Sequence, residues 1–261
     1  MATGAFDSAA AAYEAVRGFP PGVGEQVAQA ALDRFGRQAR VLEVGVGTGR
    51  IARPLLALGV NVIGLDLSAQ MMRQLRVILP AGAVDPALVQ GDANHLPLAE
   101  ASFDAIVSVH VFQLLADWEG VVSEVRRVLR PGGVFLNGYE WRPSDSPGAR
   151  LMDHWRLLLE AAGQPALAAG ARDFSDLKYQ LLQTGANCRE QDVGQWSTTR
   201  TLARQLETIE HRTWLPGAGE TRGALAGCLA QLRAWAVAEF GALDQARSVP
   251  HRFVWQSFQW N

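Results

Sequence analysis

The stretch VLEVGVGTGR (residues 41–50) decides the fold of this chain, because it joins a short apolar run to a turn with three alternate glycines. Gly45, Gly47 and Gly49 carry no Cβ, so the backbone of the turn can come close to a ligand. A helix predicted to begin near Arg50 would point its first amide groups into the same space. The turn therefore predicts a site for a nucleotide-like ligand at the end of a buried strand.

The spacing of this turn separates it from two common phosphate-binding loops. A dinucleotide loop reads GxGxxG and a P-loop ends in GK followed by Ser or Thr, whereas this turn reads ExGxGxG. Glu43 stands two residues before the first glycine. A carboxylate there is unfavourable beside a pyrophosphate and favourable near an ammonium or sulfonium group. We therefore expect a ligand that carries positive charge.

Two further carboxylates follow the next predicted strands. Asp66 comes 21 residues after Gly45, a position from which a carboxylate can accept both hydroxyls of a ribose. Asp92 ends the following strand, where it can accept a hydrogen bond from the exocyclic amine of adenine. With Glu43, these acids outline one crevice at the carboxyl ends of adjacent parallel strands. The sequence thus predicts a nucleoside with a cationic group.

Apolar runs of strand length alternate with helix-length segments from residue 25 to residue 140, which is typical of a parallel sheet with crossover helices. The LRPGG segment at 129–133 is expected to end the last of these helices, because proline cannot continue it. The predicted strands lie at 40–46, 61–67, 87–93, 103–112 and 133–141.

The text after residue 142 is mainly helical and ends in an alternating, strand-like run. We expect an α/β fold: a Rossmann-like, mostly parallel seven-stranded sheet with helices on both faces and an inserted helical cap. The predicted organisation is a single domain over 1–261, with a cofactor-binding half at 25–141, a helical cap at 142–187 and 201–241, and terminal strands at 188–200 and 251–260.

Composition limits the possible partners and the compartment. With 24 basic and 26 acidic residues the chain has no positive excess with which to bind nucleic acid. Cys188 and Cys228 lie far apart and outside any metal-ligand pattern, so we expect two free thiols and no metal. No stretch has the roughly 20 apolar residues of a membrane span, and the N-terminal text is unlike a signal peptide. We expect a cytoplasmic protein that acts on a small molecule.

The quoted features together resemble the class I S-adenosylmethionine-dependent methyltransferases, and within them the type 11 family. The matching text lies over about residues 38–140 and comprises VLEVGVGTGR, VIGLDLS followed by MM, GDANHLPLAEASFDAIVSVHVFQLLADW, and VLRPGG. The resemblance implies that Glu43 and the glycine turn face the methionine portion of S-adenosylmethionine and that Asp66 faces its ribose. Asp92 and Ala93 would then meet the adenine edge, and Met71 the face of that ring. The cofactor residues implied in this way are Tyr13, Arg17, Glu43, Gly45, Val46, Gly47, Gly49, Asp66, Leu67, Met71, Asp92, Ala93 and His110.

Three of these residues lie outside the glycine turn and the strand-end acids. Tyr13 and Arg17 match a YxxxR opening that would close over the cofactor, with Arg17 pairing with its carboxylate. His110 matches a position whose backbone meets the methionyl group. Its side chain is either a general base, which a hydroxyl acceptor would require, or a structural group satisfied within the core.

The sequence therefore predicts a methyltransferase that moves a methyl group from S-adenosylmethionine to a small molecule. Two other functions stay open at this point. One is a nicotinamide-dependent oxidoreductase on a related sheet, which the glycine spacing and Glu43 oppose. The other is a non-catalytic protein that binds S-adenosylmethionine. Neither the acceptor atom nor the oligomeric state follows from the sequence.

Overall fold

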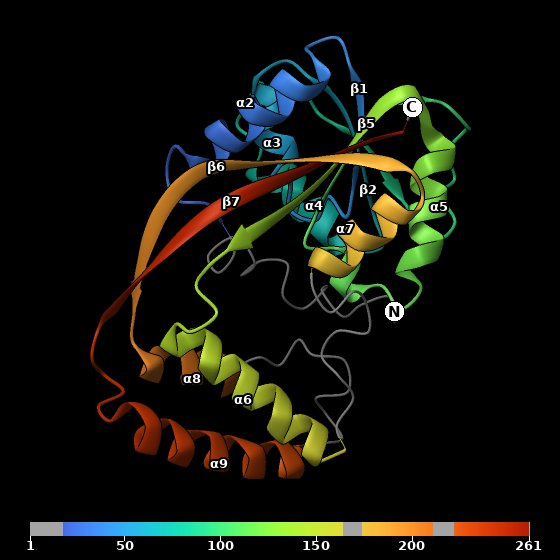
Figure 1. The fold of residues 1–261 in the computed structure, drawn as a ribbon. Coiled ribbons are helices and arrows are strands. Elements are labelled where there is room, and N and C mark those ends of the chain that lie inside the picture. Colours follow the sequence, from blue (N-terminus) through green and yellow to red (C-terminus); the bar gives the residue numbers. More distant parts are fainter. Residues whose placement is uncertain (1–17, 164–173, 211–221, 261) are drawn as a thin grey trace. The chain divides into compact units, whose positions relative to one another are not determined.

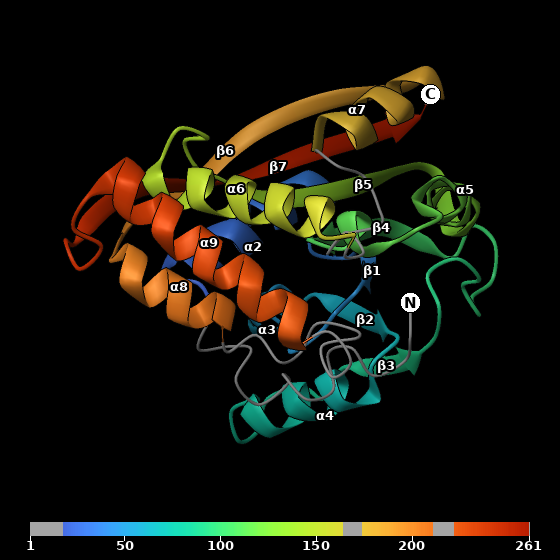
Figure 2. The same ribbon diagram turned by 90° about the horizontal axis from the view of Figure 1, so that it is seen from below.

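The computed structural model describes residues 18–163, 174–210 and 222–260. Seven strands form one sheet in the order β3-β2-β1-β4-β5-β7-β6, which Figure 2 shows from β3 beside α4 to β6. The strands are β1 (Arg40–Val44), β2 (Asn61–Asp66), β3 (Ala87–Gln90), β4 (Phe103–Val109), β5 (Leu129–Trp141), β6 (Ala186–Arg200) and β7 (Arg247–Trp260). The described helices are α2 (Val23–Phe35), α3 (Ala52–Ala57), α4 (Ala69–Ile78), the 3-10 turn η2 (Phe112–Leu114), α5 (Trp118–Val128), α6 (Pro147–Ala161), α7 (Phe174–Gln183), α8 (Leu202–Glu210) and α9 (Arg222–Phe240).

The first five strands pair in parallel, with β1 in the middle. Glu43 on β1 lies opposite Gly64 on β2 and Val107 on β4, so the carboxyl ends of these strands reach one edge of the sheet. In Figure 1, β7 runs in the opposite direction to β5, which makes the sheet mixed. The predicted fold class, a mostly parallel seven-stranded Rossmann-like sheet, is confirmed.

Helices cover both faces of this part of the sheet (Figure 1). Leu42 and Val44 of β1 belong to a core cluster with buried residues of α5 and α7. Because successive side chains of a strand point to opposite faces, Glu43 points to the other side, where the Ala52 amide at the start of α3 hydrogen-bonds to it. On that side Trp255 of β7 also donates its indole N–H to the Val27 carbonyl of α2, at 3.0 Å.

The LRPGG segment differs in part from the prediction. Helix α5 ends at Val128, as expected, but strand β5 already begins at Leu129. Leu129 pairs with Phe103, and Val134 pairs with Ala105, so the intervening residues bulge out of the ladder. Gly132 has a φ of 76° within this bulge. The proline and glycines therefore shape an interruption of the strand instead of a loop before it.

The chain divides into two compact units. The first comprises residues 1–140, 168–194 and 253–261, and the second comprises residues 141–167 and 195–252. The first unit holds the glycine turn and the strand-end acids. The second has its own core, in which α6, α8 and α9 bury Leu151, Trp155, Leu206 and Leu232. These three helices appear together in Figure 2. The predicted organisation as a single domain stays a prediction.

Candidate functional site

The glycine turn has the backbone conformation that its sequence predicts. Gly45, Gly47 and Gly49 have φ values of 74°, 54° and 80°, all in the left-handed region that favours glycine. A Cβ on Gly45 would collide with the side chain of Val111, which follows β4. The turn after β1 and the loop after β4 therefore touch each other, because Gly45 leaves room for Val111.

Helix α4 closes the other side of the turn. A Cβ on Gly49 would lie 2.8 Å from Leu75, and one on Gly47 would lie 3.4 Å from the terminal methyl of Met71. Met71 is buried, and its amide caps α4 by donating to Ser68 Oγ at 3.1 Å. Close packing thus explains part of the glycine pattern, and Met71 lies against the turn where the predicted cofactor would bind.

Glu43 is a buried acid whose side chain has too few hydrogen-bond partners to offset its loss of hydration. Its side chain is only 3% exposed, and its Oε2 atom has no hydrogen-bond partner among the residues that the structure describes. Burial raises the pKa of Glu43 well above its ordinary value, and the nearby Asp66 carboxylate raises it further, against a smaller lowering by the Ala52 amide. A cation beside Glu43 would relieve both effects.

Asp66 lies at the carboxyl end of β2 and joins that strand to the glycine turn. Its Oδ2 accepts the amide N–H of Gly47 and its Oδ1 accepts that of Ser68, both at 2.8 Å. Each carboxylate oxygen has a second lone pair, so these bonds leave acceptor capacity for a ligand. Asp66 therefore fixes the turn at the same time as it offers the ribose contact predicted for it.

Asp92 organises the turn after β3. Its Oδ1 accepts the backbone N–H and the side-chain amide of Asn94, each at 2.9 Å. The Asn94 N–H is the largest influence that lowers the pKa of the exposed Asp92 below its usual value, so it is a carboxylate at neutral pH. Ala93 beside it is buried. Val46 is buried within the glycine turn, whereas Leu67 is partly exposed after β2.

His110 follows β4 and adopts a φ of 57°, a left-handed conformation that is uncommon for a residue with a side chain. Its Nδ1 lies 3.5 Å from Nε2 of Gln113, and its Nε2 lies 3.9 Å from Oε1 of Glu140. Strained backbone of this kind is typical of functional sites, where the surrounding structure holds it in place.

Glu140 and Arg50 were not among the predicted site residues. Glu140 lies near the end of β5 and forms an ion pair with Arg50, which directly follows the glycine turn. Burial alone would raise the pKa of Glu140, but the His110 imidazole and the Arg50 guanidinium together hold it well below the ordinary value. The rule that selected Asp66 and Asp92, an acid at the end of a parallel strand, would also have selected Glu140. Tyr13 and Arg17 lie outside the described residues.

Comparison with known proteins agrees with this geometry. Residues 42–137 match the family described as Methyltransferase domain, of type 11. Residues 42–137 of the chain therefore form a methyltransferase domain of this type. The predicted resemblance to the type 11 methyltransferases is confirmed for these residues, which run from β1 to the middle of β5.

Curated relatives match about half of this chain. A malonyl-[acyl-carrier protein] O-methyltransferase of Methylococcus capsulatus is 38% identical over 130 residues, which cover 49% of this chain and 47% of that protein. The chain spans about half or less of the length of the curated relatives that it matches first.

Solved structures share the fold at lower identity. A methyltransferase-like protein of Bacillus halodurans has a TM-score of 0.59 and 18% identity, over 88% of this chain and 95% of that one. A phosphoethanolamine N-methyltransferase 2 of Haemonchus contortus, solved with S-adenosyl-L-methionine, has a TM-score of 0.55 and 21% identity, over 100% of this chain and 60% of that one.

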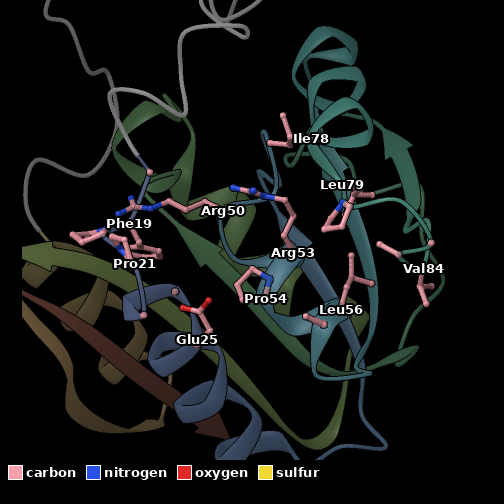
Figure 3. Close-up of a pocket in the computed structure, with 18 residues that line it drawn as sticks. Phe19, Pro21, Glu25, Arg50, Arg53, Pro54, Leu56, Ile78, Leu79 and Val84 are labelled. Carbon is pink, nitrogen blue, oxygen red and sulfur yellow. The ribbon is translucent and has the colours of Figure 1, made fainter.

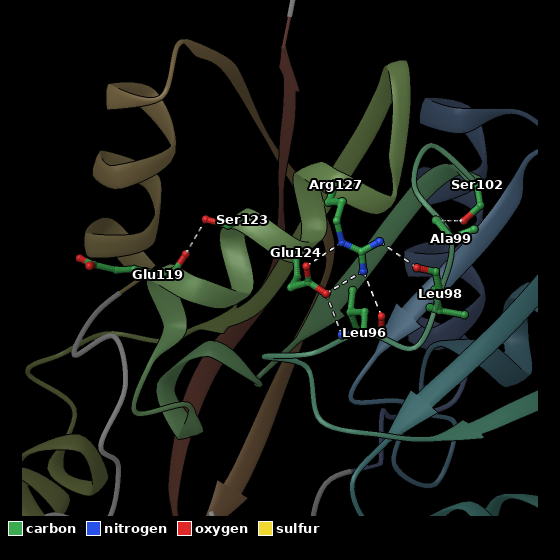
Figure 4. Close-up of polar contacts among 8 residues, drawn as sticks. All are labelled: Leu96, Leu98, Ala99, Ser102, Glu119, Ser123, Glu124 and Arg127. Carbon is green, nitrogen blue, oxygen red and sulfur yellow. Dashed lines mark hydrogen bonds and ion pairs between the residues drawn. The ribbon is translucent and has the colours of Figure 1, made fainter.

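A charged cluster anchors the loop that follows Asp92 in the methyltransferase domain (Figure 4). Arg127 of α5 binds both oxygens of Glu124, at 2.7 and 2.8 Å, and donates to the carbonyls of Leu98 and Leu96 at 2.9 and 3.0 Å. Glu124 in turn accepts the amide of Leu96 at 2.8 Å. Glu124 and Arg127 thus hold in place the loop that would meet the adenine.

A cavity of about 610 Å³ lies beside α3 of the methyltransferase domain (Figure 3). It is lined mainly by apolar side chains before α2 and after α4, together with Arg50, Arg53 and Glu25. Arg50 crosses its upper side, and its Cζ atom lies 3.6 Å from the ring centre of Phe19. None of the predicted cofactor residues that the structure describes lines this cavity, but its Arg50 also forms the ion pair with Glu140 at the strand ends.

Other classes of site find no support in the part of the chain described. No group of three His, Cys, Asp or Glu residues there is arranged to hold a metal ion. None of the described helices is both long and apolar enough to cross a bilayer. Cys188 and Cys228 are free thiols.

Proposed function

We propose that the chain transfers a methyl group from S-adenosylmethionine to a small-molecule acceptor. S-adenosylmethionine supplies a methyl carbon bound to a positively charged sulfur, which is lost as a neutral thioether when a nucleophile takes the methyl group. The protein needs no nucleophile of its own for this chemistry. Its task is to bind both molecules, align them and exclude water.

The observation that carries the proposal is the state of Glu43. A buried carboxylate with one oxygen lacking a hydrogen-bond partner among the described residues is costly unless a cation approaches it. Gly45 and Gly47 hold the turn next to it in a left-handed conformation, with Val111 and Met71 packed against them. A ligand with an ammonium and a sulfonium group fits this environment, whereas the pyrophosphate of a nicotinamide dinucleotide would face a carboxylate.

The remaining cofactor contacts follow from the positions of the strand-end residues. We assign the ribose hydroxyls to Asp66, with Leu67 beside it, and the adenine to Asp92 and Ala93. Met71 would cover the adenine ring, and the backbone of Val46 and His110 would meet the methionine portion. Tyr13 and Arg17 remain proposed as the residues that close over it.

The acceptor is proposed only as a small molecule. Relatives are named for an O-methyltransferase and an N-methyltransferase, so their names do not agree on one acceptor atom. The helices after residue 142 are proposed to cover the acceptor, and a cytoplasmic location is proposed with them.

Calorimetry with S-adenosylmethionine, S-adenosylhomocysteine and NADH tests the proposed cofactor. We expect micromolar binding of the first two and no measurable heat with NADH. Preferential binding of NADH would contradict the proposal. Incubation with methyl-labelled S-adenosylmethionine and a metabolite extract then tests catalysis, with mass spectrometry for a labelled product that is one CH₂ heavier than its precursor. Cofactor binding without any labelled product would favour the non-catalytic alternative.

A further inference from the structure

Arg50, His110 and Glu140 form a charged cluster at the carboxyl ends of three neighbouring strands. Arg50 follows the turn after β1, His110 follows β4, and Glu140 lies near the end of β5, and these strands are adjacent in the sheet. Open parallel sheets bind their ligands at this edge. The cluster therefore lies at the edge of the sheet where the ligand is predicted, next to the glycine turn.

The contacts within the cluster are directional. Nε2 of His110 faces Oε1 of Glu140 at 3.9 Å, while Nδ1, on the other side of the ring, faces the Gln113 amide at 3.5 Å. Because the Gln113 amide nitrogen is a donor, the contact with it favours the tautomer with the lone pair on Nδ1, the nitrogen able to accept a proton, and with the hydrogen on Nε2, at ion-pair distance from Glu140. The Gln113 contact is at the long limit of a hydrogen bond, so an acceptor hydroxyl could replace it.

Arg50 determines which member of the pair holds a proton. Its ion pair with Glu140 stabilises the charged carboxylate, and Arg50 is itself held over the ring of Phe19 at 3.6 Å. Glu140 therefore stays anionic beside the imidazole. An anion there stabilises the imidazolium that forms when Nδ1 takes a proton, as a buried carboxylate does in other histidine–carboxylate pairs.

The cluster also differs from a purely structural ion pair in this chain. Arg127 binds Glu124 and two backbone carbonyls, and it thereby anchors a loop. Arg50 by contrast has a buried Nε without a hydrogen-bond partner among the described residues, and the histidine of its cluster sits on strained backbone with a φ of 57°. Strain at the ligand edge of the sheet favours a functional role for His110.

Resting on the proposed function, we propose that Glu140, fixed by Arg50, positions His110 to take the proton from a hydroxyl acceptor. As the acceptor oxygen bonds to the methyl carbon, its O–H bond breaks and the proton moves to Nδ1 of His110. The electron pair of the carbon–sulfur bond stays on sulfur, so the positive charge passes from the sulfonium to the imidazolium, which then loses its proton to water. A neutral amine would not need this base, because it can lose its proton after the transfer. His110 is the proton-accepting residue and Glu140 is a positioning residue.

The first test measures the imidazole directly and needs no substrate. His110 is one of five histidines, so its signals in a long-range ¹H–¹⁵N spectrum can be assigned by their loss in His110→Asn. Asparagine suits this position because it tolerates a positive φ.

We expect the neutral imidazole of His110 to carry its hydrogen on Nε2. In Glu140→Gln the titration midpoint of His110 should move to lower pH by about one unit, because the imidazolium loses its anionic neighbour. Asp85→Asn, which removes an exposed carboxylate paired with Arg76, is the matched control and should leave the midpoint unchanged. An unmoved midpoint in Glu140→Gln, or Nδ1–H as the tautomer, would overturn the pairing.

The second test uses phenol and catechol as hydroxyl probes and aniline and 1,2-diaminobenzene as matched amines. With a hydroxyl probe, we expect the rate to rise with pH through the titration of His110 and kcat to fall about 100-fold or more in His110→Asn. In Glu140→Gln the rising limb should move to lower pH, which a merely structural role would not cause. Methylation of the amines, with equal rates in wild type and His110→Asn, would overturn the assignment. Failure of the wild-type protein to bind S-adenosylhomocysteine would instead contradict the proposed function, and it would leave the spectroscopic result on the pair intact.

Discussion

Two glutamates, the buried Glu43 and the partly buried Glu140, stand at the same edge of the sheet in opposite electrostatic states. Glu43, on β1, has a hydrogen bond from the Ala52 amide and an Oε2 without a partner among the described residues, and burial raises its pKa. Glu140, on β5, has Arg50 and His110 beside it, and they lower its pKa despite burial. The protein thus compensates the second carboxylate itself, and we propose that a cationic ligand compensates the first.

The largest expected effect separates the two glutamates by their contributions to stability. Glu140→Gln leaves the Arg50 guanidinium, which is largely but not fully buried, without its anion and should lower the free energy of unfolding by about 3 kcal/mol at neutral pH. Glu43→Gln removes an undercompensated charge and should change it by less than about 1 kcal/mol. Urea denaturation of both variants measures the difference. Equal losses would mean that the two carboxylates are compensated alike.

The pH dependence of these same variants should also be opposite. The folded pKa of Glu140 is lowered, so its stabilising contribution is present above about pH 4.3, the unfolded value, and is lost as the pH falls from there through the folded pKa. The folded pKa of Glu43 is raised, so its contribution is present below about pH 4.3 and is lost as the pH rises through the folded pKa. The destabilisation by Glu140→Gln should therefore shrink in acid.

A substitution in the glycine turn tests the contact between the turn after β1 and the loop after β4. Gly45→Ala places a Cβ against Val111 at a φ of 74°, whereas Gly36→Ala meets no atom within 4 Å at a φ of 79°. Both incur the cost of a left-handed residue, roughly 1–2 kcal/mol, but the first should lose about 2 kcal/mol more through overpacking. Denaturation curves for the pair give the difference. Recovery of that excess in Gly45→Ala combined with Val111→Ala would identify the clash as its cause.

Substitution of Asp66 tests the part of the crevice to which we assign the ribose. Asp66→Ala removes the acceptor for the Gly47 and Ser68 amides together with the proposed hydroxyl contacts. Affinity for S-adenosylhomocysteine should fall by about 1–2 kcal/mol in calorimetry. Asp85→Asn, which changes an exposed carboxylate near α4, should leave that affinity unchanged. An unchanged affinity in Asp66→Ala would remove this residue from the proposed site.

The smallest expected effect is a proton released from Glu43 on cofactor binding. A cation favours the charged carboxylate, so binding should lower the raised pKa of Glu43 and release a proton to the buffer. Affinity for S-adenosylmethionine should then rise by at most about tenfold per pH unit between about pH 4.3 and the raised pKa. Calorimetry in buffers of different ionisation enthalpy measures the proton, and Glu43→Gln should abolish its release. Persistence of the release in that variant would assign it to another group.

Sequence patterns predicted the local features of the first unit and missed its long-range contacts. The alternation of strands and helices, the three left-handed glycines and the acids at successive strand ends could be read locally, because period and glycine placement are set by neighbouring residues. The bulge at LRPGG could not, since it depends on the pairing of Leu129 with Phe103, a partner 26 residues away. Nor could the alignment of Arg50 with Glu140, which are 90 residues apart.

The sequence by itself determined the kind of ligand edge this protein has, through glycine spacing and acids whose positions follow from strand periodicity. Only the tertiary structure decided how each carboxylate there is compensated. Compensation depends on which charges lie within a few ångströms after folding, and the pairing of distant strands β1, β4 and β5 sets those distances. For that reason Glu43 and Glu140 look alike in the sequence and behave oppositely in the folded protein.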